Sequence, residues 1–146
     1  MITIGRIGAA DRAAWDTLFT GYNVFYGRTP DQSFLDRAWS RFEPDTDLHA
    51  LGATLDGELV GIAHFFTHPS TTAADVCYLQ DLFTSEAARG KGVGRALITA
   101  VADWAREQGC GRLYWLTHED NTTARRLYDQ VAINKGFIQY QLPLEG

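Results

Sequence analysis

The sequence is poor in cysteine and contains no long hydrophobic run. Its 146 residues include two cysteines, Cys77 and Cys110, which are far apart and form no CxxC pair. No apolar run approaches the ~20 residues of a membrane-spanning helix, and residues 1–15 lack the apolar stretch of a signal peptide. These absences argue against a disulfide-stabilised secreted domain and a membrane protein. We therefore expect a reduced, cytoplasmic protein with no membrane partner.

Positive charge is also scarce, with 13 Lys and Arg against 18 Asp and Glu and a formal net charge of −5. A nucleic-acid-binding domain normally has a basic surface, so we expect no nucleic-acid partner. The four histidines lack metal-ligand spacing such as HExxH, so we expect no metal site. Apolar residues are abundant, at 45% with 12% aromatics. In a chain of this length they predict one globular domain, residues 1–146, with its own core.

The first third of the chain predicts one strand and two helices. Residues 1–7 are rich in isoleucine and indicate a strand, after which Asp11 is expected to cap a helix. Residues 21–27, GYNVFYG, are predicted to form a loop dense in aromatics. A second helix is expected to begin at Pro30-Asp31 and to end before Pro44.

The remaining two thirds predict a mixed sheet. Asp56-Gly57, between two apolar runs, is typical of a β-hairpin. The expected elements are strands at 49–55, 58–68 and 75–84, a helix at 93–108, a buried strand at 113–117, a helix capped by Asn121, and a last strand at 136–142. Antiparallel strands followed by β-α-β-α-β indicate an α/β fold with helices on both faces of the sheet. The strands at 75–84 and 113–117, which one helix joins, should be parallel neighbours.

A glycine-rich bend, Arg89-Gly90-Lys91-Gly92-Val93-Gly94, separates the strand at 75–84 from the amphipathic helix that follows it. Glycines let backbone amides approach an anion, and the first turn of a helix has unpaired N–H groups at a positive dipole end. Arg89, Lys91 and Arg95 add three cations. The bend therefore predicts a phosphate site. It is not a Walker loop, because Gly92 follows Lys91, nor a GxGxxG fingerprint, because Arg95 occupies the last position.

The pattern that this bend does meet is Arg/Gln-x-x-Gly-x-Gly, which resembles the acetyl-CoA pyrophosphate loop of the GNAT superfamily of N-acetyltransferases. Downstream, Asn121, Ala124 and Tyr128 stand in the pattern Asn-x-x-Ala-x-x-Leu-Tyr, followed by Gly136-Phe137, which resembles the second GNAT motif. The sequence is most similar to the small histone-and-polyamine acetyltransferase-like branch. Seven residues separate Tyr128 from Gly136, and this longer insert also occurs in that branch. Gln80 departs from the similar spermidine/spermine acetyltransferases, which have glutamate there, and this departure puts polyamine specificity in doubt.

The resemblance implies a GNAT-like acyl-CoA N-acyltransferase fold and acetyl-CoA as co-substrate. It also implies a homodimer that acetylates a primary amine of a small molecule, a polyamine or a lysine side chain by direct attack in a ternary complex. The residues that it implies for acetyl-CoA binding are Leu82, Phe83, Thr84, Arg89, Gly90, Lys91, Gly92, Val93, Gly94, Arg95, Asn121, Ala124 and Tyr128.

Acetyl transfer requires a neutral amine, and at pH 7 only on the order of one lysine-like amine in 10³ is neutral. A general base is therefore useful. Asp81 is the carboxylate nearest the reaction centre in sequence; Glu119, Asp120 and His64 are further candidates. Simple alternation along the strand would place Gln80 and Asp81 on opposite faces. The resemblance implies that Tyr128 supplies a proton or hydrogen bond to the leaving sulfur.

The acceptor pocket is expected to involve Tyr22, Tyr26, His64, His68 and Gln80. Structural roles stay open for several candidates: Asp81 as a hydrogen-bonding strand residue, Asn121 as a helix cap and Tyr128 as a core aromatic. Two alternative functions also stay open. One is a non-catalytic acyl-CoA-binding sensor on the same fold, and the other is a transferase for a bulkier acyl group. Thiol release with a panel of amines separates the enzyme from the sensor.

Overall fold

A computed structural model describes residues 1–145 as two compact units. The first, here called the sheet unit, is Met1–Leu116, and the second, the C-terminal unit, begins at Thr117. In order, the elements of the sheet unit are β1 (Ile2–Arg6), η1 (Ala9–Asp11), α1 (Arg12–Phe25), α2 (Gln32–Phe42), β2 (His49–Leu55), β3 (Glu58–His68), β4 (Val76–Thr84), η2 (Glu86–Ala88), α3 (Val93–Glu107) and β5 (Arg112–Tyr114). The C-terminal unit contains α4 (Thr122–Val131). The expectation of one domain over the whole chain stays a prediction.

The sheet has the strand order β1-β2-β3-β4-β5. β1 to β4 are antiparallel neighbours, whereas β5 is parallel to β4, with Val76 opposite Arg112 and Tyr78 opposite Tyr114. The turn between β2 and β3 has positive φ at Asp56 (52°) and Gly57 (85°), as a tight hairpin requires. The predicted hairpin, the mixed sheet and the parallel pair are confirmed.

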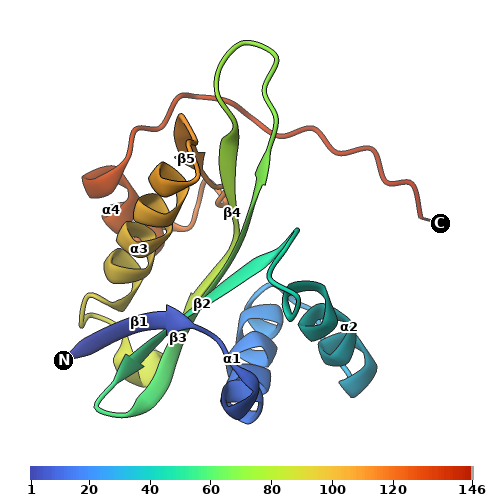
Figure 1. The fold of residues 1–146 in the computed structure, drawn as a ribbon, viewed down its shortest axis with the longest axis vertical. Coiled ribbons are helices and arrows are strands. Elements are labelled where there is room, and N and C mark those ends of the chain that lie inside the picture. Colours follow the sequence, from blue (N-terminus) through green and yellow to red (C-terminus); the bar gives the residue numbers. More distant parts are fainter. Residues whose placement is uncertain (146) are drawn as a thin grey trace. The chain divides into compact units, whose positions relative to one another are not determined.

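Helices cover both faces of this sheet (Figure 1). Ile62 belongs to the buried cluster that β3 forms with α1 and α2. A Cβ placed on the preceding residue, Gly61, would lie 2.7 Å from Val93 of α3. Because neighbouring strand residues point to opposite faces, α1 and α2 cover one face and α3 covers the other. The face under α1 and α2 is here called the α1 face.

The core on the α1 face is largely aromatic. Trp15, Phe19, Trp39 and Phe42 are buried there, and the Trp15 ring centroid lies 5.1–5.3 Å from the other three. Such pairs stabilise a core beyond their buried area. His64, a buried polar residue, lies within this aromatic cluster.

Three expected elements of the sheet unit differ from the structure. The predicted loop at 21–27 is instead largely helical, because α1 runs to Phe25. Gly21 does not break the helix; a Cβ there would come within 3.0 Å of the Phe83 ring, so glycine permits close packing. Asp11 precedes α1, but its carboxylate accepts from the N–H of Gly8 at 2.9 Å and does not cap α1. β5 is a three-residue, half-buried strand rather than a buried strand over 113–117.

In the C-terminal unit, the predicted cap is confirmed: the Asn121 side chain accepts from the N–H of Ala124 at 3.4 Å. The predicted strand at 136–142 is wrong, because residues 133–145 form no helix or strand. A strand requires a backbone partner, and among the described residues this unit has α4 as its one regular element. The alternating apolar residues of the segment are exposed: Ile138, Tyr140, Leu142 and Leu144.

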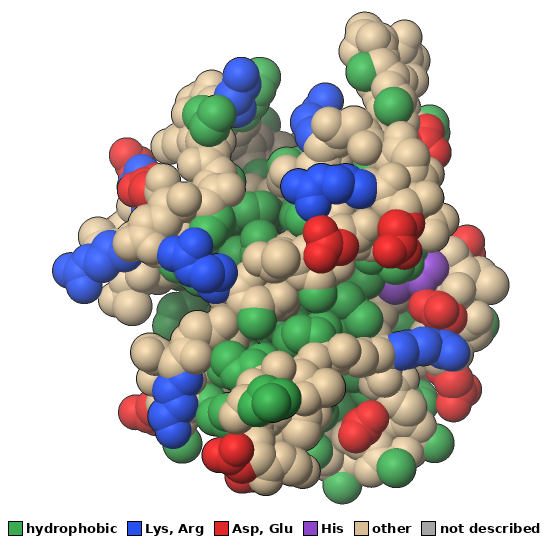
Figure 2. Space-filling model, turned by 60° about the vertical axis from the view of Figure 1, so that its left-hand side comes forward, with side chains coloured by type: hydrophobic (Ala, Val, Ile, Leu, Met, Phe, Trp, Pro, Cys, Tyr) green, Lys and Arg blue, Asp and Glu red, His purple; other side chains and the backbone are tan. Residues whose placement is uncertain are grey.

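Two further properties bear on function. Among the described residues, no helix is both long enough and apolar enough to span a bilayer. In the same part of the chain, no group of three His, Cys, Asp or Glu side chains is arranged to hold a metal ion. On the face that Figure 2 presents, acidic and basic side chains are interspersed.

Candidate active site

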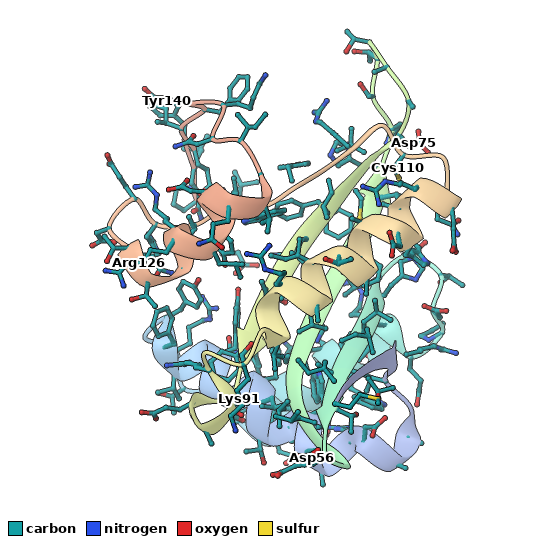
Figure 3. All side chains as sticks on the ribbon, turned by 90° about the vertical axis from the view of Figure 1, so that its left-hand side faces the viewer. Asp56, Asp75, Lys91, Cys110, Arg126 and Tyr140 are labelled. Carbon is teal, nitrogen blue, oxygen red and sulfur yellow. The ribbon has the colours of Figure 1, made fainter. Side chains whose placement is uncertain are left out.

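The glycine-rich bend forms a backbone cradle at the start of α3. Gly90 and Gly92 have φ of 81° and 84°, and a Cβ at either would meet no atom within 4 Å. Positive φ, rather than crowding, therefore explains the glycines. The N–H of Ala96 donates to the C=O of Gly92 at 3.0 Å, and the amides before Ala96 have no acceptor within α3. Figure 3 shows Lys91 on this bend, at the opposite end of the sheet unit from Asp75 and Cys110.

Cations surround the cradle. Arg89, Lys91 and Arg95 are exposed, and the Arg89 guanidinium carbon lies 5.8 Å from the centroid of the Phe83 ring at the end of β4. Positive side chains next to a helix N-terminus favour a bound anion. The predicted residues of the sheet unit, from Arg89 to Arg95, are therefore brought together in an arrangement that can hold a phosphate or pyrophosphate.

One edge of β4 is unpaired over half its length. Its ladder with β5 ends at Tyr78 opposite Tyr114, whereas its ladder with β3 continues to Thr84. Within the sheet unit, residues 79–84 thus have a strand neighbour on one side only. Leu82, Phe83 and Thr84, all half-buried, lie on this open edge just before the cradle. An extended amide-containing ligand can pair with such an edge as an added strand.

A β-bulge lies within the open edge. Across the β3–β4 ladder, Phe65 pairs with Leu79 but His64 pairs with Asp81, so Gln80 is an extra residue. The bulge interrupts the simple alternation from which the faces of Gln80 and Asp81 were predicted. Without it, Asp81 would share a face with Leu79. Instead Asp81 lies opposite His64 on the α1 face, while Gln80 is exposed.

Asp81 is surrounded by phenols. Burial raises the pKa of Tyr22 far above its usual range, and the charge of Asp81 and a hydrogen bond to it raise it further. Burial raises the pKa of Tyr26, and the charge of Asp81 raises it further. The pKa of Tyr78 is also raised, mainly by burial and in smaller part by the charge of Asp81. These tyrosines therefore stay neutral around a carboxylate whose side chain is 14% exposed. A neutral aromatic site with one carboxylate suits a cation.

His64 differs from the expected pocket residue. Its side chain is 2% exposed, its Nε2 lies 3.0 Å from the indole nitrogen of Trp15, and its Nδ1 lies 2.9 Å from Oδ2 of Asp81. A buried ring with both nitrogens engaged cannot line the acceptor pocket or act as the base. His68 is half-buried: its Nδ1 lies 2.9 Å from the Pro69 C=O and its Nε2 lies 3.0 Å from the Tyr114 hydroxyl. Because a carbonyl only accepts, Nδ1 of His68 donates to the Pro69 C=O.

Trp15 and Arg28 also lie near Asp81 and its phenols, although no sequence pattern gives either residue a role at the site. Arg28 donates from Nε to Oδ1 of buried Asn23 at 2.7 Å, and its guanidinium carbon lies 5.9 Å and 5.6 Å from the ring centroids of Tyr22 and Tyr26. Trp15 is a fully buried core residue of α1. For Arg28, no sequence motif signals the contact, because it depends on how α1 ends.

The remaining predicted residues belong to the C-terminal unit, which is described by itself. Asn121, Ala124 and Tyr128 follow one another at i, i+3 and i+7 along the start and body of α4, and all three are half-buried. This spacing places them on one side of the helix.

Comparison with known proteins agrees with this geometry. The model of the Acetyltransferase (GNAT) family matches residues 13–132. A D-amino-acid N-acetyltransferase of Saccharomyces cerevisiae is 33% identical over 144 residues, which cover 96% of this chain and 89% of the yeast protein. An L-ornithine N5-acetyltransferase of Arabidopsis thaliana is 34% identical over 90 residues, 61% of this chain and 40% of the plant protein. A solved aminoglycoside N-acetyltransferase in complex with CoA has the same fold, with a TM-score of 0.85 and 19% identity over 99% of this chain and 95% of that one.

The family match spans most of the chain, and the yeast relative is 33% identical over 96% of it. The chain belongs to the GNAT acetyltransferase family and is an acetyl-CoA-dependent N-acetyltransferase.

Proposed function

We propose that the chain acetylates the primary amine of a small molecule by direct attack on acetyl-CoA in a ternary complex, with Asp81 as the base. The observation that carries this proposal is the position of Asp81. It lies next to the bulge at Gln80, partly exposed, beside neutral phenols, on the open edge of β4 and directly before Leu82. An ammonium group bound among these phenols would contact the Asp81 carboxylate beside the end of the pantetheine arm, which is proposed to pair with β4 as an added strand.

Asp81 accepts a proton from the bound ammonium group, directly or through one water, and the neutral nitrogen attacks the thioester carbonyl carbon. The carbonyl oxygen becomes an oxyanion, which a backbone N–H near Leu82 stabilises. The C–S bond then breaks, the amide forms, and Tyr128 donates a proton to the leaving sulfur. The nitrogen releases its second proton to solvent as the amide forms. Solvent then returns a proton to the Tyr128 phenolate and takes the proton from Asp81, so each turnover of an ammonium substrate releases one proton.

Acetyl-CoA is proposed to bind along the open edge and the cradle. Leu82, Phe83 and Thr84 would pair with the pantetheine arm as an added strand. The amides of residues 90–95 and the three nearby cations would hold the pyrophosphate. Asn121, Ala124 and Tyr128 would contribute from α4. The positive φ of Gly90 and Gly92 supports the cradle, because it turns successive backbone groups in one bend.

The acceptor is proposed to be an amino acid or a similar amine that also carries a carboxylate. Tyr22, Tyr26, His68 and Gln80 would line its pocket, and the phenol rings would favour its ammonium group. Arg28, held by Asn23 beside two of these rings, would pair with the carboxylate. The yeast and plant relatives, named for D-amino-acid and L-ornithine acetylation, support this choice.

We further propose a cytoplasmic homodimer of single-domain chains. The low cysteine content supports the compartment. The exposed apolar residues of the C-terminal unit support an association surface.

The test is acetyl-CoA-dependent thiol release with paired acceptors, each amino acid beside the amine that lacks its carboxylate. We expect activity with the parental protein, and a fall in kcat of about 10²–10⁴ for Asp81→Asn. Acetyl-CoA affinity by calorimetry should be retained in that variant. The substitution Arg28→Gln should raise KM for the amino acid and not for its carboxylate-free partner. Binding of acetyl-CoA without thiol release from any amine would instead favour a sensor.

A further inference from the structure

A buried chain of hydrogen bonds runs from α1 to the proposed base. The indole nitrogen of Trp15 lies 3.0 Å from Nε2 of His64, and Nδ1 of His64 lies 2.9 Å from Oδ2 of Asp81. Trp15 is 0% exposed and His64 is 2% exposed. Only the far end of this chain, Asp81, reaches solvent, with 14% of its side chain exposed.

The protonation of His64 follows from its partners. An indole N–H is a donor only, so Nε2 of His64 must accept and carries no proton. The single ring proton is then on Nδ1 and is donated to Asp81. The distance between His64 and Asp81 would also fit an imidazolium–carboxylate ion pair. Trp15 excludes that state, because an imidazolium would point a second N–H at the indole N–H.

The surroundings of His64 reinforce this neutral state. The rings of Phe19 and Phe42 lie 5.1 Å and 4.9 Å from the imidazole, from α1 and α2 respectively. The charged groups near this cluster include Asp81 from β4, Glu43, which accepts from Trp39 at 3.2 Å, and Arg12 from α1, whose guanidinium carbon is 5.6 Å from the Trp15 ring. Arg12 is itself paired with Asp16 and Asp36. The indole N–H of Trp15 donates to Nε2 of His64.

We infer that Trp15 and His64 are positioning residues that hold Asp81 in one orientation while leaving its negative charge uncompensated. A neutral N–H anchors one carboxylate oxygen and leaves lone pairs for the amine proton. An imidazolium in the same place would anchor the oxygen equally well but would neutralise the base. Trp15 therefore acts on Asp81 through two hydrogen bonds, because it sets which nitrogen of His64 carries the proton. This inference rests on the proposed role of Asp81.

The first test reads the state of His64 in the unaltered protein. Long-range proton–nitrogen NMR distinguishes a ring protonated at Nδ1 from one protonated at Nε2 or at both. We expect the Nδ1–H form. Either of the other forms in the parental protein would overturn the inference. This measurement does not depend on whether any variant folds.

The second test compares two tryptophan variants. Trp15→Phe keeps an aromatic ring but removes the donor to His64, so the Nδ1–H form is no longer imposed on the ring. Trp39→Phe is the matched control: Trp39 lies in the same cluster, 5.2 Å from Trp15, but donates to Glu43 at 3.2 Å. In the same NMR measurement, Trp15→Phe should show a mixture of His64 forms, and its kcat should fall about tenfold while KM for acetyl-CoA stays unchanged. Trp39→Phe should keep the Nδ1–H form and the parental kcat. The parental His64 form and the parental kcat in both variants would overturn the inference.

The third test varies His64 itself. His64→Asn keeps an N–H near the Nδ1 position, whereas His64→Leu has a similar size and no donor. We expect kcat of the Leu variant to fall about tenfold, kcat of the Asn variant to recover most of this loss, and KM for acetyl-CoA to change in neither. Equal kcat values for the two variants would contradict the inference. If Asp81→Asn retains full kcat, Asp81 is not the base and the inference fails with that assignment. If Asp81→Asn loses activity but the His64 and Trp15 variants keep the parental kinetics, Asp81 remains the base and only the inference fails.

Discussion

At the scale of single residues, burial controls which groups can ionise. Cys77 on β4 is 0% exposed, and burial raises the pKa of its thiol from 9.0 to about 12, with a smaller contribution from the charge of Cys110. The folded state therefore favours the neutral thiol. A thiol of this kind reacts slowly with alkylating reagents, because the thiolate is the nucleophile.

The raised pKa of Cys77 predicts a loss of stability at high pH. Its contribution is fully present below pH 9 and is lost as the pH rises from 9 toward 12, because the unfolded chain releases the thiol proton first. At pH 10, one unit above the ordinary pKa of 9.0, the loss is about 1 kcal/mol. Urea unfolding at pH 8 and pH 10 should show a smaller decrease for Cys77→Ala than for the parent. Cys110→Ala, at a less buried thiol, is the control; an equal decrease in all three proteins would contradict the prediction.

Tyr128 yields the second prediction at this scale. Tyr128→Phe keeps the ring and removes only the hydroxyl, so folding and acetyl-CoA affinity should change little. A thiol with a pKa near 8.5 leaves tolerably as the thiolate, so the loss in kcat should be about tenfold to a hundredfold. Steady-state kinetics with a good amine measures it. An unchanged kcat would leave Tyr128 as a packing residue of α4.

At the scale of elements, the two ends of α3 offer a matched pair. Gly92 precedes the helix with φ of 84°, Gly109 follows it with φ of 83°, and a Cβ at either would meet no atom within 4 Å. Each substitution by alanine should therefore cost a similar 1–2 kcal/mol, roughly the strain of a left-handed residue. Only Gly92→Ala should weaken acetyl-CoA binding, because its Cβ would stand where the phosphates approach. Calorimetry that shows equal affinity for both variants would refute the cradle.

Elements set by local chemistry were predictable from the sequence. The hairpin at Asp56-Gly57 and the start of α3 after Gly92 depend on positive φ, which the residue types reveal. The bulge at Gln80 was not predictable, because it appears only when β4 is paired with β3. The helix through Gly21 was not predictable for the same reason. Gly21 lets the Phe83 ring pack closely against α1, and a contact between α1 and β4 leaves no signal in the local sequence.

At the scale of the whole molecule, the site was predicted in part. The residues of the cradle lie together because they are consecutive. The network of Trp15, His64 and Asp81 joins three elements and could not be read from spacing. The predicted last strand fails for a related reason: alternation shows that one side of residues 136–144 is apolar, but not which strand pairs with it.

The same segment leads to the prediction on assembly. Ile138, Tyr140 and Leu142 alternate with Gln139 and Gln141, and the three apolar side chains are 75–89% exposed. We expect sedimentation at micromolar concentration to give a species of twice 16.2 kDa. Tyr140→Ser with Leu142→Ser should shift it toward the monomer, whereas Gln139→Ser with Gln141→Ser should not. A monomer in every case would remove the homodimer.

The open edge of β4 has a consequence for handling the protein. From residue 79 to residue 84, this strand has a ladder partner on one side only within the sheet unit. Bare strand edges recruit other chains, and the pantetheine arm is proposed to cover this one. Preparations stripped of CoA should therefore cloud sooner during storage than those kept with it. In a cell, the lifetime of the enzyme would follow the supply of its own acetyl donor.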